Sequence, residues 1–408
     1  MTVELLLPAG NLQKIRCAFY YGADAVYCGL PAFSLRTLEN QITNKEMEQG
    51  IKLARKLGKK IYITLNAFPH NEKLEFLDQY LETVNNLNPD GLVIADAGIF
   101  AKAQKHCPKI PLHISVQANI VNYLTARFWY EQGAKRIIVS RQLSIPEIAK
   151  IHQECPKLEL EVFVHGSICM AYSGHCFLSN YMSNRDANQG VCAHSCRWKY
   201  KVKRAELIEE ERPSESMPIE ESEDGTHIFS SRDLCAIEYL KDLLKAGVTS
   251  LKIEGRNKTV YYLATVARAY REALDDALMN KPFNSDLILE LEKTAHRGFF
   301  TGFLVGLPNA SAIQDKANTS RGTHNFLGEV LKYNSKTSQA LISVRNPIQI
   351  GDEVEFVLSK RKNDFLQKIT TMTNIDFEPI EIAHGGHFDV WIPVDKKVMK
   401  GVVIRKKL

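Results

Sequence analysis

An alternation of short β-forming runs and helical patterns, from residue 3 to about residue 280, is the feature that most limits the fold. Every run except the seventh is followed directly by a segment with apolar residues at helical spacing, such as "NKEMEQGIKLARKLG". The expected strands lie at 3–7, 24–29, 60–68, 91–96, 112–117, 136–140, 158–166 and 249–255. Alternating β and α units form parallel sheets, and eight such units suggest a closed TIM-type (β/α)8 barrel. The alternative is an open doubly wound sheet, which the lack of a glycine-rich loop after the first run disfavours.

The pattern changes to short strands alone from about residue 323, which predicts a separate small all-β barrel. The expected domains are therefore a catalytic barrel over 1–310 and a small β-barrel over 323–408. An insertion at 166–231 follows the seventh strand and contains a group of cysteines and an acidic stretch. The stretch carries nine acidic residues between Glu206 and Asp224, so we expect a solvated loop there.

Composition limits the compartment and the class of partner. No apolar run approaches the ~20 residues needed to span a bilayer. The N-terminal stretch "MTVELLLPAGN" has no basic residues of the kind that open a signal peptide. We therefore expect a cytoplasmic protein with no membrane partner. The formal net charge of +5 suits a polyanionic partner without identifying one.

Polar residues at alternate strand positions predict a lined cavity inside the barrel, because the outer face of each strand must pack on helices. The third, fifth and eighth strands carry them: Thr64 and Asn66; His113, Ser115 and Gln117; Lys252, Glu254 and Arg256. An unpaired buried cation would cost several kcal/mol. The alternative interpretation is an ion-pair network of Lys252, Glu254 and Arg256 that simply fills the barrel.

Active sites of (β/α)8 barrels lie at the carboxyl ends of the strands. We accordingly predict catalytic roles for His113, Gln117, His165, Lys252 and Glu254. We predict substrate-binding roles for Arg256, Arg141, Asn66 and Asn119. Because the cysteine-rich segment starts directly after His165, it must lie over the mouth of the cavity.

Four of the nine cysteines, Cys169, Cys176, Cys192 and Cys196, lie in this segment with the spacing C-x6-C-x15-C-x3-C. Cytosolic thiols stay reduced, so the group suggests metal ligation more than disulfides. Zinc ligands usually come in pairs two to four residues apart, which only the last two cysteines satisfy. Iron–sulfur clusters tolerate more varied spacing. An iron–sulfur cluster, a zinc site and unligated thiols all remain open from the spacing, and His165, His175 or His194 could replace one cysteine.

Several segments together resemble the collagenase-like U-type peptidase family (peptidase family U32). They are "LLLPAGN", "GADAVYCGL", "HISVQAN", "VHGSICMAYSGHCFLSNY", "QGVCAHSCRWKY", "SLKIEGR" and "AHRGFFTGF", in the expected order over the whole barrel. Within that family the chain is most similar to the bacterial tRNA hydroxylation proteins. The resemblance implies hydroxylation of the wobble uridine of tRNA to 5-hydroxyuridine, with prephenate as co-substrate.

The resemblance also implies a [4Fe–4S] cluster on Cys169, Cys176, Cys192 and Cys196. Some relatives use a later cysteine as the fourth ligand, which makes Cys235 the alternative to Cys196 here. The implied partners are the anticodon loop of tRNA and a small dicarboxylate, and Arg and Lys side chains suit both anions. The basic run "CRWKYKVKR", with aromatic residues among the cations, could also track RNA phosphates.

Three other functions compete with this interpretation. Relatives act on ribosomal RNA, so another RNA could be the target. The family name suggests a peptidase, but the chain has neither a G-x-S-x-G elbow nor an H-E-x-x-H zinc helix. A non-enzymatic iron–sulfur accessory subunit is the third alternative, against which the polar cavity argues. The sequence does not indicate the oligomeric state.

Overall fold

The computed structural model describes residues 3–35, 42–169, 171–197, 231–308, 322–386 and 388–408. The acidic stretch from Glu206 to Asp224 and most of the basic run "CRWKYKVKR" lie outside these ranges. Within them, no helix combines the length and the apolar character that crossing a lipid bilayer requires.

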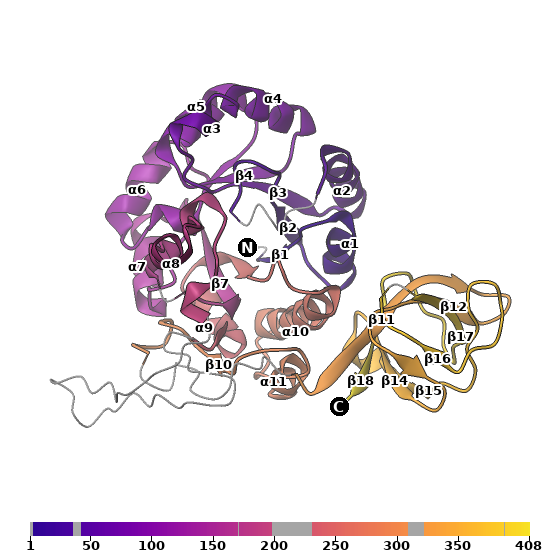
Figure 1. The fold of residues 1–408 in the computed structure, drawn as a ribbon. Helices are drawn as coiled ribbons and strands as arrows, with labels where there is room; N and C mark the ends of the chain where they lie inside the picture. Colours follow the sequence, from indigo (N-terminus) through magenta and orange to yellow (C-terminus); the bar gives the residue numbers. More distant parts are fainter. Residues whose placement is uncertain (1–2, 36–41, 170, 198–230, 309–321, 387) are drawn as a thin grey trace, which may run out of the picture.

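Eight parallel strands close into a barrel, which confirms the predicted fold class (Figure 1). They are β1 (Glu4–Pro8), β2 (Ala25–Cys28), β3 (Lys60–Leu65), β4 (Gly91–Ile94), β5 (Leu112–Ile114), β6 (Arg136–Ile138), β7 (Glu159–Ser167) and β9 (Val248–Ile253). Each strand pairs with the next, and β9 pairs with both β7 and β1 to close the ring. The strand Leu5–Leu7 is fully buried, as expected for a strand covered on both sides.

Helices surround the barrel as an outer ring (Figure 1). They are α1 (Leu12–Tyr20), α2 (Asn44–Leu57), α3 (Asn71–Leu74), α4 (Leu77–Leu87), α5 (Ala97–His106), α6 (Tyr123–Glu131), α7 (Ile145–Glu154), α9 (Leu240–Lys245) and α10 (Val260–Leu278), followed by α11 (Asp286–Leu291). Local chemistry sets their ends. Thr43 and Glu46 form a capping box at the start of α2, and Gly58 ends that helix in the left-handed conformation.

The segment before the eighth barrel strand differs from the predicted helix at 232–246. The chain first forms β8 (Asp233–Cys235), which pairs antiparallel with the end of β7, and only then a short 3-10 turn and α9. A further strand, β10 (Phe299–Phe300), pairs with β8. The difference arises because β7 extends past the barrel rim and offers a free edge, which β8 covers.

The C-terminal part is all-β, as predicted, and forms a half-barrel. Its antiparallel sheet has the order β15 (Phe365–Lys368), β14 (Glu353–Val357), β18 (Val403–Lys407), β11 (His324–Asn334), β12 (Gln339–Val344) and β17 (Phe388–Pro393). A two-stranded sheet of β13 (Ile348–Gln349) and β16 (Ile382–Ala383) accompanies it. No backbone ladder joins the described edge strands β15 and β17. The Gln367 side chain instead donates to Pro393 O at 2.7 Å and accepts from Asp395 N at 2.9 Å.

A buried charge network joins the half-barrel to the α10–α11 side of the barrel. Arg405 on β18 is fully buried and donates to Glu290 on α11 at 2.8 Å and to Glu355 on β14. Arg268 on α10 contacts both Glu290 and Asp364. Burial alone would raise the pKa of Glu290, but Arg268 and Arg405 outweigh it and lower that pKa to about 2.

The amino-terminal end of the barrel is filled by polar residues that we call the floor network: Glu4, Tyr62, Arg136, Glu161 and Ser250. Arg136 Nη1 lies 2.7 Å from Glu4 Oε1 and 3.0 Å from Glu161 Oε2. The Ser250 hydroxyl donates to both carboxylates, and the Tyr62 hydroxyl donates to Glu4 at 2.6 Å. Because each buried charge has an opposite partner, the network closes this end of the barrel.

We expect Arg136→Met to destabilise the protein, because the buried Glu4 and Glu161 carboxylates would lose their shared partner. Leaving a buried charge unpaired costs roughly 3–5 kcal/mol, so the melting temperature should fall clearly in differential scanning calorimetry. The control Lys150→Met removes an exposed ion pair with Glu154, and such pairs contribute about 0–1 kcal/mol. Equal melting temperatures for the two variants would contradict this role of the floor network.

Candidate functional site

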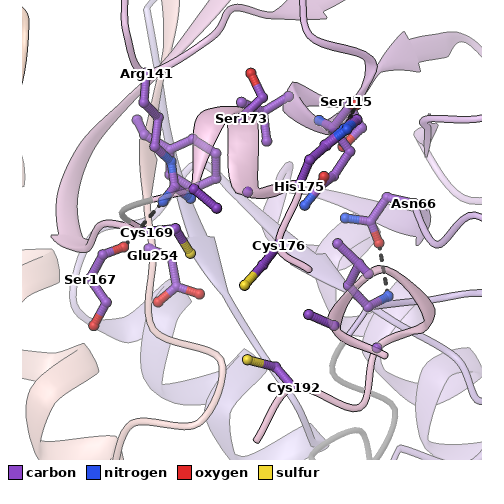
Figure 2. A pocket seen from close by; sticks show the side chains of 18 of the residues that line it. Asn66, Ser115, Arg141, Ser167, Cys169, Ser173, His175, Cys176, Cys192 and Glu254 are labelled. Atoms are coloured by element: carbon purple, nitrogen blue, oxygen red, sulfur yellow. Dashed lines mark hydrogen bonds between the residues drawn. The ribbon is translucent and has the colours of Figure 1, made fainter. Parts of the chain in front are cut away.

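A cavity of about 410 Å³ lies inside the mouth of the barrel. Its inner wall comes from the strands and the turns that follow them, through Tyr27, Thr64, Asn66, Val93, Ser115, Phe163, Lys252, Glu254 and Arg256. Its outer wall comes from residues 167–196, here called the cysteine segment, which includes the short helix α8 (Leu178–Ser183). The prediction that this segment covers the mouth is therefore confirmed, and Figure 2 shows the two walls facing each other.

Lys252 links the cavity to the floor network. Its Nζ lies 2.6 Å from Glu161 Oε1, with both side chains almost fully buried. It also lies 4.4 Å from the centroid of the Tyr27 ring and 5.3 Å from that of Phe163. Burial lowers the pKa of Lys252, and the Glu161 carboxylate opposes that shift. The alternative of a purely internal Lys252–Glu254–Arg256 plug does not describe this arrangement, because the three side chains line an open cavity.

Arg256 lies in the wall beside Lys252 and is 5% exposed. Its Nη1 donates to Ser34 Oγ at 2.9 Å, and its guanidinium carbon lies 5.6 Å from the Tyr27 centroid. The turn that carries Arg256 is held from both sides: Lys14 Nζ donates to Arg256 O at 2.7 Å, and Tyr262 OH donates to Glu254 O at 2.9 Å.

Gly255 is required in this turn. Its φ is +147°, and a Cβ atom would lie 2.6 Å from Tyr262 Cε1. Tyr262 also holds the turn through its hydroxyl, so the ring has little room to move away. The glycine therefore fixes how Glu254 and Arg256 enter the cavity wall.

Arg141, Asn66 and Gln117 also line the cavity, as predicted. Arg141 Nη1 donates to Ser167 O at 3.2 Å, and its guanidinium carbon lies 4.0 Å from the Phe163 centroid (Figure 2). Asn66 Oδ1 accepts from Leu35 N at 3.1 Å. These contacts hold the Arg141 and Asn66 side chains in the cavity wall.

The four cysteines of the segment, Cys169, Cys176, Cys192 and Cys196, are not joined by disulfides and all line the cavity. Figure 2 shows the sulfurs of Cys169, Cys176 and Cys192 directed into the same space, near the Glu254 carboxylate. In the described part of the chain, no three His, Cys, Asp or Glu side chains are close enough to share one metal ion. A tetrahedral ion with bonds of ~2.3 Å would need its sulfurs about 4 Å apart. Four cysteines are the usual ligand set of an iron–sulfur cluster, so the residue types that line this space suit such a group.

Hydrogen bonds to the barrel hold the cysteine segment in place. Ser173 Oγ donates to Asn119 Oδ1 at 2.7 Å, and a ring nitrogen of His175 contacts Gln117 O. Within the segment itself, Arg185 donates to the carbonyl oxygens of Val191 and Cys192. Asn119 lies outside the cavity lining and accepts from Ser173, which positions the segment, so its substrate-binding role stays a prediction.

His165 was predicted to be catalytic, and the structure places it outside the cavity. A register shift in β7 between Phe163 and His165 turns the histidine ring away from the barrel interior. The ring packs against Tyr262, Tyr270 and Phe299, and burial lowers its pKa to about 3. His165 is therefore a neutral core residue.

Cys235 and His113 also lie apart from the cavity lining. Cys235 is buried on β8 with its Sγ 3.8 Å from Tyr270 OH, and burial raises its pKa to about 11, so it does not join the other thiols. His113 faces inward but beside the floor network, 4.9 Å from the Tyr62 ring, in the space that Gly91 leaves open. Burial, with Arg136 nearby, lowers its pKa well below the usual value, and its position beside the floor network gives its predicted catalytic role no support.

Two contributors to the site were not predicted. Glu161 lies at an inward position of "LELEVFVHG" and pairs with Lys252. A carboxylate between apolar residues of a strand indicates a buried ion pair and could have been used to predict it. Ser34, which accepts from Arg256, lies in a loop after the second strand where residue type alone carries no such signal.

Comparisons with known proteins agree with this architecture. Residues 10–314 match the model described as peptidase family U32, and residues 322–405 match the model of the peptidase family U32 C-terminal domain. The chain is 40% identical over 430 residues to "tRNA hydroxylation protein P" of Escherichia coli, covering 96% of this chain and 93% of that protein.

Other relatives carry other names. The "23S rRNA 5-hydroxycytidine C2501 synthase" of Escherichia coli is 32% identical over 72% of this chain and 44% of that protein. The "Collagenase" of Porphyromonas gingivalis is 27% identical over 97% of this chain and 95% of that protein. Since a family model matches most of the barrel and a second matches the half-barrel, the chain belongs to peptidase family U32.

Proposed function

We propose that this protein is an RNA-modifying hydroxylase that converts the wobble uridine of tRNA to 5-hydroxyuridine, with prephenate as co-substrate. The observation that carries the proposal is one cavity lined both by four cysteines and by the cationic side chains of Lys252, Arg256 and Arg141. The near full-length similarity to tRNA hydroxylation protein P supports the reaction class.

The cationic side chains suit the two anions of such a reaction. A dicarboxylate such as prephenate would be bound by Arg256 and Lys252, which lie on one wall of the cavity. The target base sits inside the anticodon stack and must leave it to enter a cavity of this kind. Glu254, beside both cations, is the residue that can accept a proton from the bound substrate.

We further propose that Cys169, Cys176, Cys192 and Cys196 hold a [4Fe–4S] cluster. Replacing the C5 hydrogen of uracil by a hydroxyl group is a two-electron oxidation that also adds an oxygen atom, and a bound cluster would supply electron transfer at this cavity. The residues of this chain would hold the cluster at the outer wall, opposite Lys252 and Arg256.

The competing functions have less support. The peptidase alternative needs a serine activated by a histidine, but Ser167 Oγ accepts from Arg297 while the nearby His165 faces Tyr270. The ribosomal RNA alternative draws on a relative that matches over only 44% of its own length, whereas tRNA hydroxylation protein P matches over 93%. No described feature favours the non-enzymatic accessory subunit.

Mass spectrometry of nucleosides from a strain that lacks this protein tests the proposal. We expect 5-hydroxyuridine derivatives to disappear from tRNA and to return when the gene is restored. Unchanged tRNA with loss of a hydroxylated nucleoside from ribosomal RNA would instead support the ribosomal alternative. Unchanged nucleosides in both RNAs would contradict RNA hydroxylation.

Protein purified without oxygen should be brown and contain about four iron and four sulfide per chain. Replacing Cys169, Cys176, Cys192 or Cys196 by Ala should remove most of the visible absorbance, because each thiolate is a ligand. Cys155→Ala is the control, since Cys155 is buried elsewhere with its Sγ near Tyr123 O. A colourless anaerobic preparation with stoichiometric zinc would contradict the cluster.

We expect Arg256→Lys to abolish hydroxylation while iron content and melting temperature stay close to those of the wild type. Lysine keeps the charge but loses the planar fork that binds a carboxylate through two hydrogen bonds. Arg271→Lys is the control, because Arg271 pairs with Asp24 and Asp275 outside the cavity. Normal activity in folded Arg256→Lys protein would contradict the assignment, and unfolding would show that Arg256 mainly supports Ser34 and Thr64.

A further inference from the structure

The cysteine segment leaves a large aromatic residue uncovered at the cavity. Phe177, directly after Cys176, lines the cavity and is nevertheless 73% exposed. Tyr172 and Met182 on the same segment are also exposed. Keeping apolar surface in water is unfavourable, so a ring as exposed as that of Phe177 at the edge of a cavity is suited to contact with a bound molecule.

The other aromatic group at this edge is already engaged. Phe68, in the loop after β3, packs edge-on against His175 with ring centroids 5.4 Å apart. His175 in turn contacts Gln117 O, which anchors the segment to the barrel. Phe177 has no such ring partner among the described residues. It lines the cavity and leaves most of its ring surface available to a ligand.

The charges around Phe177 indicate the chemistry of that ligand. The cavity lining contains three cationic side chains, Arg141, Lys252 and Arg256, and a single carboxylate, Glu254. An exposed aromatic residue next to a cationic groove is the combination that binds unpaired nucleotides, because the ring stacks on the base and the cations attract the phosphates. A neutral or basic peptide would not need this excess of positive charge, and an acidic peptide would not need an exposed ring beside it.

We propose that Phe177 is the platform on which an unpaired RNA base stacks as it enters the cavity. This inference rests on the proposed function and names the residue that receives the base. A base that leaves its own stack loses the contact with its neighbours. The Phe177 ring replaces part of that contact at the cavity entrance and holds the base between the thiols and the cationic wall.

A binding assay tests the inference without measuring hydroxylation. It compares a labelled single-stranded oligouridine with the same oligomer carrying abasic sites. Phe177→Ala should weaken oligouridine binding by a factor between about 5 and 150, which corresponds to the loss of one base–aromatic stack. The abasic oligomer should bind both proteins equally, and Phe177→Tyr should retain the wild-type preference. Phe388→Ala is the matched control, because Phe388 is 58% exposed on the half-barrel and lies outside the cavity lining.

Three results would overturn the inference. The first is equal oligouridine binding by wild type and Phe177→Ala, and the second is a clearly lower melting temperature of Phe177→Ala. The third is tighter binding of gelatin-derived peptides than of RNA at the Phe177 surface. The second would show that the ring packs within the protein. Loss of base-dependent binding in Phe177→Ala supports the platform even if the deletion strain shows unchanged tRNA, so this inference and the proposed function fail separately.

Discussion

The buried ion pair between Lys252 and Glu161 is the interaction on which the site depends. A cation in the interior of a barrel is tolerated only beside an opposite charge, and Glu161 supplies it from the neighbouring strand at 2.6 Å. Glu161 also accepts from Arg136, so the same carboxylate belongs to the floor network and to the cavity. Paired charges thereby close the amino-terminal end of the barrel, and the end at the mouth is left open for a ligand.

The insertion after β7 turns this open half into an enclosed site. It crosses the mouth, is held by Asn119, Gln117 and the backbone of its own turns, and brings four thiols opposite Lys252 and Arg256. The gathering of four cysteines in one stretch of sequence therefore has a structural explanation. One segment supplies every proposed ligand of the cluster, and the barrel supplies every cation.

Much of this arrangement was predictable because strands alternate. Thr64 and Lys252 lie at inward strand positions, as period-two patterning predicts. Asn66, Gln117, Glu254 and Arg256 also line the cavity, but from the turns that follow β3, β5 and β9. The same rule failed for His165, because a register shift in β7 reverses the face on which a residue lies. Such a shift depends on the pairing with β9 and leaves no trace in the residue types.

Other parts were not predictable for different physical reasons. His113 faces inward as expected, but its depth relative to the cavity depends on strand stagger, which places it beside Tyr62. Cys235 was the alternative fourth ligand because some family members use a later cysteine, whereas the pairing of β8 with β7 buries it against Tyr270. Ser34 contributes to the Arg256 environment from a loop, where no periodicity constrains the side chain.

The central claim is that the cavity between the thiols and the cationic wall is where RNA is hydroxylated. The most direct measurement is reconstitution: anaerobically purified protein, unmodified tRNA transcribed in vitro and prephenate, followed by mass spectrometry of the nucleosides. The account predicts 5-hydroxyuridine at the wobble position with wild-type protein, and none when Lys252 is replaced by Met in protein that retains its iron. Product formed equally by that variant would contradict the account, as would the absence of product with fully loaded wild-type protein.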